Sequence, residues 1–458
     1  MRFLPKNSMT WIALILATLG STRWQTELLF AQTTESKLSR DEKVRLDKAK
    51  FESSDRWIYN ELEIGFTEAK QANKPLLVAM RCIPCEECVK LDDDLIEKDP
   101  AVQILLDEFV CVRLVSTNGL DLSLFQFDTD QSFNIFIFNP DRTIYGRYGT
   151  RSARSRWQDD VSVDGLVDAL KGALDLHKNY DQIKDSLTGK TGTKPQVVRP
   201  EQFPTLKNQF TASLDYEGNV VKSCIHCHQI GDAQRDQLRL QNEPIPDELL
   251  FPYPHPKSIG LILSPNEKAT IKQVSQDSLA DQTGLLAGDK IQAINGQPIL
   301  SIADIQWVLH HVPASGGSLE ISLLRGEIAA TFELRLPNHW RQQSGIQWRV
   351  STWGLRRMGL GGLMLTANLL DENATSIQQD TSATVSVKSV GQYGPHAAAK
   401  RAGFKVGDQI IKFGKLENIQ SEQQILRYAV QQTKPGDLVT VTIIRDGEEA
   451  TLQLPMQR

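Results

Sequence analysis

The chain has 458 residues, of which 40% are hydrophobic and 23% charged, and its formal net charge is −5 at pH 7. This length predicts about three domains, and the composition is that of a globular protein with enough apolar residues to build a core. The small negative charge and the lack of a long basic run argue against nucleic acid as a partner.

The first residues have the pattern of an export signal. Arg2 and Lys6 precede an apolar stretch from Trp11 to Gly20. A membrane helix needs about 20 apolar residues, so this shorter stretch predicts a signal peptide over 1–31, with an uncleaved anchor as the alternative and no other membrane span. We therefore expect an exported protein, in the periplasm or another extracytoplasmic compartment, where disulfides persist and c-type haem can be attached.

Residues 53–180 alternate between apolar strands and amphipathic helices. Leu76–Met80, Val110–Val115 and Phe133–Phe138 have the length and composition of strands. Asp99-Pro100 is typical of a helix start, because an acidic residue caps the first amides and proline fits the first turn. The order of elements predicts an α/β domain.

Three cysteines follow the first of these strands. The run Cys82-Ile-Pro-Cys85-Glu-Glu-Cys88 leads into a helical pattern that begins at Leu91. The order of strand, Cys-x-x-Cys, helix, strand, hairpin and helix resembles the thioredoxin fold, and Cys-x-x-Cys-x-x-Leu is similar to the motif of exported thioredoxin-like proteins. The resemblance implies a thiol–disulfide oxidoreductase in which Cys85 attacks as a thiolate and Cys88 resolves the mixed disulfide.

The sequence departs from that family at three places. The family's cis-proline would fall at Phe133, and its buried acidic residue would fall at Ala79. Glu86 and Glu87 lie inside the motif, where negative charge opposes thiolate formation, so a strong oxidant is not expected. A fixed disulfide without turnover is therefore an alternative to an active redox site.

Two further cysteines lie in this domain. Cys82 is a third thiol beside Cys85 and Cys88, which allows three pairings or a soft site for Cu(I). Cys111 lies inside an apolar strand, so we expect it to be an unreactive residue of the core.

A polar linker over 181–202 leads to a segment of about fifty residues, 203–257, which is too short to build a secure core alone. This segment contains Cys224-Ile-His-Cys227-His228, which resembles the attachment motif of c-type cytochromes. The resemblance implies thioether bonds from Cys224 and Cys227 to haem c, with His228 as an axial ligand of the iron.

The second ligand of such a site is less well defined. No methionine occurs between Met80 and Met358, so His255 is the nearest candidate for a metal ligand beside His228. The alternatives are a zinc site that uses the same cysteines and histidine, a local disulfide, or no cofactor at all. An electron-transfer haem protein with an inert thioredoxin-like part is a further hypothesis.

The C-terminal part contains an internal repeat. Thr283-Gly-Leu-Leu-Ala-Gly-Asp-Lys-Ile291 recurs as Ala402-Gly-Phe-Lys-Val-Gly-Asp-Gln-Ile410 at an offset of 119 residues. Repetition at this length predicts two duplicated domains, over 258–340 and 344–458.

Both copies resemble PDZ domains of the bacterial type. In that family a glycine loop offers backbone amides to the C-terminal carboxylate of a peptide, and the adjoining strand pairs with the peptide. The helices predicted at 302–311 and 421–431 would form the other wall of each groove. The resemblance implies the following peptide-binding residues: Ile259, Gly260, Leu261 and Ile262 in the first copy, and Leu360, Gly361, Gly362 and Leu363 in the second.

The expected fold class is multidomain, α/β plus mainly β: a thioredoxin-like α/β domain, a short Cys-x-x-Cys-His segment and two PDZ-like domains. The expected function is an exported, redox-linked peptide-binding protein. The PDZ pair would recruit C-terminal peptides of exported proteins, and the Cys85/Cys88 pair or a haem would handle disulfides or electrons. A non-enzymatic PDZ scaffold with structural disulfides or zinc is the alternative. Trypsin-like periplasmic proteases also carry tandem PDZ domains, but the chain has no Gly-x-Ser-x-Gly motif, so a serine protease is not expected.

Overall fold

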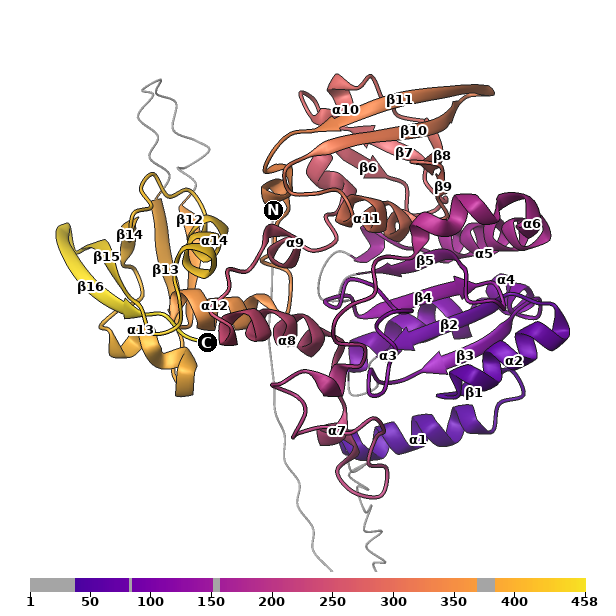
Figure 1. Ribbon diagram of the computed structural model, residues 1–458, viewed down its shortest axis with the longest axis horizontal. Coiled ribbons are helices and arrows are strands. Elements are labelled where there is room, and N and C mark those ends of the chain that lie inside the picture. The colour runs from indigo at the N-terminus through magenta and orange to yellow at the C-terminus, as the bar shows by residue number, and fades with distance from the viewer. Residues whose placement is uncertain (1–37, 82–84, 151–156, 369–383) are drawn as a thin grey trace, which may run out of the picture. The chain divides into compact units, whose positions relative to one another are not determined.

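The computed structural model describes residues 38–81, 85–150, 157–368 and 384–458 (Figure 1). Residues 39–458 form one compact unit. Within the described ranges, no helix has the length and apolar character needed to cross a membrane. The predicted signal peptide and Cys82 lie outside the described residues, so the expectations about them stay predictions.

The first domain is built on a five-stranded sheet with the strand order β1-β3-β2-β4-β5 (Figure 1). The first three strands in this order run parallel, and β4 and β5 are antiparallel to their neighbours. Every residue of β2 and β4 is buried, as the apolar runs predict for central strands. The strands are β1 (Trp57–Tyr59), β2 (Leu76–Arg81), β3 (Val110–Leu114), β4 (Phe133–Phe138) and β5 (Ile144–Thr150).

Helices cover both faces of this sheet. Leu77 and Ala79 of β2 pack into a cluster with α3, α4 and α5, whereas Val78 and Met80 point to the opposite face, toward α2 and the central segment. The Asp99 side chain accepts hydrogen bonds from the first amides of α4, which confirms the predicted helix start. The helices are α1 (Arg40–Glu52), α2 (Leu62–Ala72), α3 (Glu86–Asp92), the π-helical η1 (Asp93–Glu97), α4 (Pro100–Leu106), η2 (Trp157–Asp159), α5 (Val163–Lys178), α6 (Tyr180–Ile183) and η3 (Lys184–Lys190).

The central segment uses the core of the first domain instead of building its own. Ile225, Ile230 and Ala233 are each 1% exposed and lie in the apolar cluster that contains Met80 of β2. The longest helix of this segment begins at Cys227, inside the second cysteine motif. The helices of this segment are η4 (Pro200–Gln202), α7 (Val220–Ser223), α8 (Cys227–Leu240), α9 (Asp247–Leu250) and η5 (Pro256–Ile259).

Two β-rich domains follow. The first has a sheet of order β11-β10-β8-β9 and a hairpin of β6 and β7, and the second has a sheet of order β12-β13-β14-β15-β16. The strands are β6 (Leu261–Leu263), β7 (Ile271–Val274), β8 (Lys290–Ile294), β9 (Gln297–Pro298), β10 (Gly317–Arg325), β11 (Ile328–Leu336), β12 (Leu363–Asn368), β13 (Thr384–Val390), β14 (Gln409–Phe413), β15 (Leu438–Arg445) and β16 (Glu448–Pro455). The helices are α10 (Leu279–Gln282), α11 (Ile302–His310), η6 (Trp340–Gln343), α12 (Thr352–Leu360), η7 (Gly394–Ala397), α13 (Ala398–Arg401) and α14 (Glu422–Gln432).

The repeated Gly-Asp element has the same structural role in both domains. Asp289 accepts two hydrogen bonds from Arg325 at 2.8 Å each, and Asp408 accepts two from Arg445 at 2.7 Å each. The glycine before each aspartate has a φ near +90°, which a residue with a side chain rarely adopts. The motif therefore joins the loop to a strand in each copy and supports the fold.

Candidate functional site

The two cysteines of the first motif lie where β2 passes into α3. Cys85 is the N-cap residue of α3, and the Cys88 backbone N–H donates a hydrogen bond to its Sγ at 3.3 Å. Cys85 is partly exposed, whereas Cys88 is only 2% exposed. Backbone amides at the start of a helix stabilise a thiolate. The geometry therefore suits Cys85 for attack on a substrate disulfide, and it suits the buried Cys88 for resolving the mixed disulfide that forms at Cys85.

A lysine from α1 changes the electrostatics expected for this motif. Lys43 forms an ion pair with Glu86, the residue that follows Cys85. This positive charge offsets part of the negative charge that opposed thiolate formation in the sequence analysis. The charged lead-in to the domain was visible in the sequence, but nothing in it indicated that Lys43 would contact the cysteine helix.

A buried group of charged side chains lies beneath the cysteine motif. Asp92 of α3 is fully buried and pairs with Arg113 and with Arg81, the last residue of β2. Arg81 also pairs with Asp47 of α1. Burial raises the pKa of Asp47 above its ordinary value, although Arg81 opposes this shift. Because two arginines hold Asp92, it anchors α3 to the sheet.

Apolar, buried side chains occupy the two positions at which the thioredoxin-like family has a cis-proline and a buried acidic residue. Ala79 is 1% exposed and packs in the core, and Phe133 is fully buried at the start of β4, opposite Arg81. Cys111 is 1% exposed, and burial raises the pKa of its thiol to about 12. This confirms the prediction that Cys111 is a core residue; its lack of reactivity stays a prediction.

The second cysteine motif spans the junction of α7 and α8. Cys224 follows α7, is 3% exposed, and donates its S–H to the Ile225 carbonyl at 3.7 Å. Cys227 is the first residue of α8 and is partly exposed. His228 Nδ1 lies 3.5 Å from Asp232 Oδ2, one turn further along the helix.

His255 does not join this motif. Its Nδ1 accepts a hydrogen bond from the Lys257 backbone N–H at 3.1 Å, and its Nε2 donates to Asp160 Oδ1 at 3.0 Å. Both ring nitrogens are therefore engaged, and His255 is not placed as a partner ligand for His228. In the described parts of the chain, no three His, Cys, Asp or Glu side chains come together as a group that could hold a metal ion.

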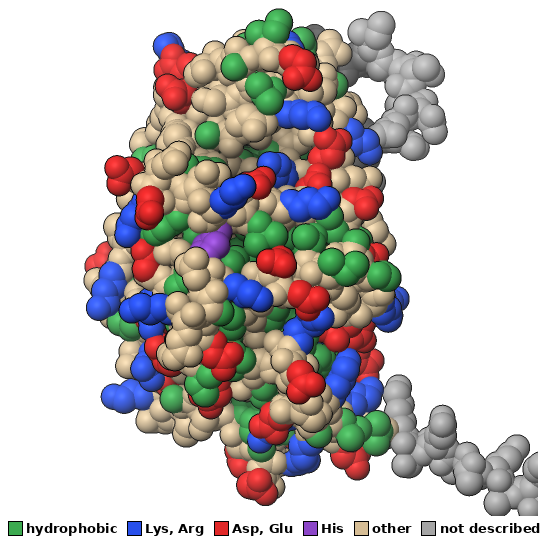
Figure 2. Space-filling view, turned by 90° about the vertical axis from the view of Figure 1, so that its right-hand side faces the viewer, with side chains coloured by type: hydrophobic (Ala, Val, Ile, Leu, Met, Phe, Trp, Pro, Cys, Tyr) green, Lys and Arg blue, Asp and Glu red, His purple; other side chains and the backbone are tan. Residues whose placement is uncertain are grey.

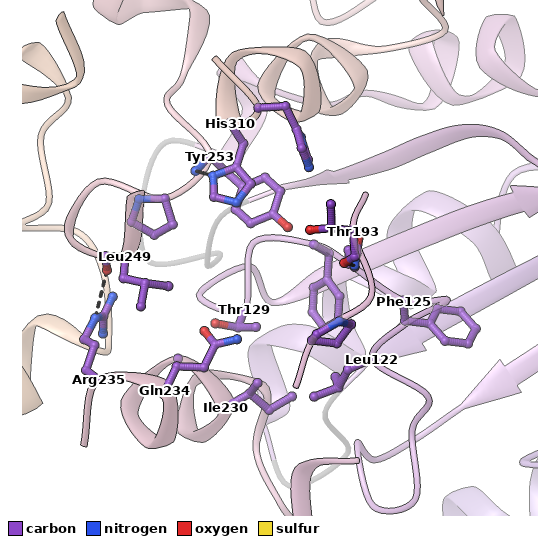
Figure 3. A pocket seen from close by; sticks show the side chains of 16 residues that line it. Leu122, Phe125, Thr129, Thr193, Ile230, Gln234, Arg235, Leu249, Tyr253 and His310 are labelled. Atoms are coloured by element: carbon purple, nitrogen blue, oxygen red, sulfur yellow. Dashed lines mark hydrogen bonds between the residues drawn. The ribbon is translucent and has the colours of Figure 1, made fainter. Parts of the chain in front are cut away.

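The arrangement around Cys224 does not fit a covalently attached haem. A thioether bond needs the edge of the macrocycle at Sγ, and protein atoms already cover the Cys224 side chain. A cavity of about 210 Å³ lies along α8 (Figure 3), but its lining from that helix is Ile230, Gly231, Gln234 and Arg235. His228 is not among the residues that line this cavity.

The cavity itself joins three parts of the chain. Figure 3 shows Tyr253 and His310 on one side and Ile230 and Leu122 on the other, and the two rings of Tyr253 and His310 stack at 4.0 Å. Arg235 donates from Nε to the Leu249 carbonyl at 2.9 Å, which fixes the loop at the edge of the cavity.

The first expected peptide-binding loop lies between η5 and β6. Ile259 and Leu261 are buried, Gly260 has a φ of +89°, and Ile262 is partly exposed. The Gly260 N–H caps η5 by donating to the Lys257 carbonyl at 3.1 Å. This amide is therefore already used within the loop.

The helix expected to form the other wall of this groove is α11, and it packs against the first domain. Asp304 accepts the Arg147 backbone N–H at 3.1 Å and pairs with Lys190 at 3.0 Å. Gln306, on the same helix, donates to the Tyr253 carbonyl at 3.3 Å. Every residue of α11 from Ile302 to Leu309 is buried. Contacts within the chain therefore cover this wall.

The second expected loop is buried. Leu360 and Leu363 are fully buried, and the Gly361 and Gly362 amides both donate to the Arg356 carbonyl, which ends α12. The sequence analysis did not predict α12, and this helix uses the amides that were expected to bind a carboxylate.

A buried ion pair also closes the groove between β12 and α14. Glu422 Oε1 accepts the Leu365 backbone N–H at 2.9 Å, and both carboxylate oxygens of Glu422 accept hydrogen bonds from Arg356 at 2.9 and 2.7 Å. An added peptide strand needs backbone groups at the edge of β12, so Glu422 takes one of the donors that such a peptide would use.

The face in Figure 2 shows positive and negative side chains interspersed, in keeping with the small net charge.

Comparisons with known proteins agree with this division of the chain. Residues 57–140 match the thioredoxin-like family, and residues 270–315 and 370–456 each match PDZ domain families. The chain therefore contains a thioredoxin-like domain followed by two PDZ domains.

Similar solved structures include the HtrA-type protease AlgW with a decapeptide, at 20% identity, and a variant of it with a decapeptide, at 19%. Each match covers 31% of this chain, 44% and 40% of those chains respectively, and has a TM-score of 0.19. This chain thus matches less than half the length of either protease chain. A comparison with curated proteins found no match.

Proposed function

We propose that the protein is an exported thiol–disulfide oxidoreductase whose redox centre is Cys85 and Cys88. The observation that carries the proposal is the asymmetry of this pair: Cys85 is partly exposed at the helix start, and Cys88 lies buried one turn further on. The Lys43–Glu86 ion pair supports it, since it reduces the electrostatic cost of a thiolate beside Glu86.

The reaction follows from these positions. The Cys85 thiolate attacks a disulfide of the substrate, forms a mixed disulfide and expels one substrate sulfur as a thiolate, which takes up a proton. Cys88 loses its proton and attacks Cys85 Sγ, which releases the second substrate sulfur and leaves a Cys85–Cys88 disulfide. Two electrons pass to the substrate, and an external dithiol must return them for a further cycle.

Reduction of insulin disulfides with dithiothreitol as the electron donor tests this function. We expect the full chain to accelerate insulin precipitation and Cys85→Ser to abolish the acceleration. Cys111→Ser is the matched control, because this thiol is buried in the same domain and should leave the rate unchanged. Equal rates for the parent and Cys85→Ser would contradict the proposal and favour a non-enzymatic scaffold.

Peptide recruitment by the PDZ pair is the finer part of the proposal. Its support is that β6 and β12 are edge strands of their sheets, the position at which a peptide can add a strand. For β12 the Glu422–Leu365 contact must first open. Fluorescence anisotropy of labelled C-terminal peptides from exported proteins tests this role. We expect the parent to bind such peptides and Gly260→Pro to bind them more weakly. A parent that binds no peptide would oppose the role.

The haem hypothesis for Cys224, Cys227 and His228 is tested separately. Expression in a host that matures c-type cytochromes, followed by a pyridine haemochrome spectrum, shows whether a haem is attached. Because the Cys224 side chain is buried, we expect it to remain a thiol and not to form a thioether with haem, so no haemochrome band should appear.

A further inference from the structure

The two Cys-x-x-Cys motifs lie at the same edge of the thioredoxin-like sheet. Strands β1, β3 and β2 are parallel, so their carboxyl ends share one edge. The first motif follows the carboxyl end of β2. The second motif is held by the loop that follows β3, although it comes more than a hundred residues later in the chain.

Hydrogen bonds fix the second motif at this edge. Thr117 Oγ1 donates to the Ile225 carbonyl at 2.8 Å, and the Ile225 backbone N–H donates to Asn118 Oδ1 at 2.8 Å. Asn118 Nδ2 also donates to the Ser223 carbonyl at 2.9 Å. Ile225 also lies in the same apolar cluster as Met80, which is next to the last residue of β2.

Helix α1 touches both motifs independently of those bonds. Asp41 Oδ1 accepts the Val221 backbone N–H at 3.0 Å, three residues before Cys224. Lys43 of the same helix pairs with Glu86, the neighbour of Cys85. In addition, Cys227 packs against the apolar cluster that contains Met80 of β2. Helix α1 therefore contacts both motifs, and Cys227 lies at the face of β2 opposite the one that α3 covers.

We propose that Cys224 and Cys227 form a second dithiol that exchanges with the Cys85–Cys88 disulfide within the same chain. This inference rests on the proposed oxidoreductase function and names the immediate partner of its redox centre. The partly exposed Cys227 is the attacking sulfur, and the buried Cys224 is the resolving one.

The exchange conserves electrons and protons. The Cys227 thiolate attacks Cys85 Sγ, breaks the Cys85–Cys88 bond and releases Cys88, which takes up a proton. Cys224 loses its proton and attacks Cys227 Sγ, which releases Cys85 as a thiolate. The chain then holds a Cys224–Cys227 disulfide and a reduced Cys85/Cys88 pair. For Cys227 to reach Cys85, the hydrogen bonds of Thr117 and Asn118 to the central segment must open.

Trapping the mixed disulfide tests the proposal. In the full chain with Cys82→Ser, Cys88→Ser and Cys224→Ser, both resolving thiols are absent, so a bond between Cys85 and Cys227 should accumulate after treatment with glutathione disulfide. Trypsin cleaves after Arg81, Lys90, Lys222 and Arg235, which puts Cys85 and Cys227 on separate peptides. Mass spectrometry of the isolated monomer should show these peptides linked.

The matched control adds Cys227→Ser and should lose the link while it keeps a glutathione adduct on Cys85. An adduct on Cys85 without the linked peptide in the first variant would overturn the exchange and leave the oxidoreductase function intact. No adduct on Cys85 in either variant would instead contradict the oxidoreductase function. A mass that shows haem bound to the Cys224–Cys227 peptide of the parent would also overturn the exchange.

Discussion

Arg356 of α12 and Glu422 of α14 form a bidentate ion pair, with side chains only 9% and 3% exposed. Glu422 also accepts the backbone N–H of Leu365 on the edge strand β12. One carboxylate therefore joins two helices and a strand, and it does so where a peptide would otherwise add to the sheet.

Removing the charge of Glu422 should open this part of the second PDZ domain. Glu422→Gln leaves Arg356 buried without a counter-charge, and loss of one partner of a buried pair costs about 3–5 kcal/mol. We expect the protection of the Leu365 amide in hydrogen–deuterium exchange to fall by about two orders of magnitude. Lys412→Met, which breaks an exposed pair with Glu417, should cost less than about 1 kcal/mol and leave that amide protected. Equal protection in all three proteins would show that the pair does not hold β12.

Much of the first domain could be predicted because its signals are local. Apolar runs gave β2 and β4 within a residue, and Asp99-Pro100 marked the start of α4. The start of α8 could not be read from periodicity. It depends on the His226 backbone N–H, which donates to Gln229 Oε1 at 2.7 Å.

The contacts of the site were harder to predict because they join distant residues. Lys43 and Glu86 are separated by 43 residues, and Thr117 and Ile225 by 108. The expected loop at Leu360–Leu363 was placed by family resemblance, which did not show that α12 would use its amides. The sequence identified the cysteines but not the side chains that hold them.

Lys43 should control how fast Cys85 reacts. Lys43→Met removes the positive charge that pairs with Glu86 beside the thiol, so we expect slower alkylation of Cys85 by iodoacetamide at pH 7. Glu86→Gln should have the opposite effect. Because both side chains are partly exposed, with 35% and 67% of their surface accessible, the changes should be within about threefold and shrink as salt is added. Identical rates in the parent and both variants would show that this ion pair has no influence on the thiol.

Cys111 should resist thiol reagents in the folded protein. Burial raises the pKa of its thiol to about 12, so almost no thiolate is present between pH 7 and pH 9. Peptide mapping after alkylation should show label on Cys111 only when a denaturant is added. Labelling of Cys111 in the native protein at the rate of Cys85 would contradict its place in the core.

Acid should destabilise the region around His310. Burial of the ring, together with charge repulsion from Arg341 and His311, holds the pKa of His310 well below its ordinary value. The unfolded chain therefore binds a proton that the folded chain does not, and stability should fall as the pH drops below about 6.5. His310→Gln should flatten this dependence in urea unfolding curves between pH 7 and pH 5. The exposed His339→Asn is the control, and it should retain the slope of the parent.

The central claim is that Cys85 attacks and Cys88 resolves. The most direct test is to treat the parent and Cys→Ser variants with glutathione disulfide and to map, by mass spectrometry, which cysteine carries the glutathione adduct. We predict that a variant with both Cys88→Ser and Cys227→Ser accumulates a stable glutathione adduct on Cys85, and that in the parent this adduct gives way to a Cys85–Cys88 disulfide. An adduct confined to Cys82 or Cys88, with Cys85 unmodified in every variant, would contradict the account.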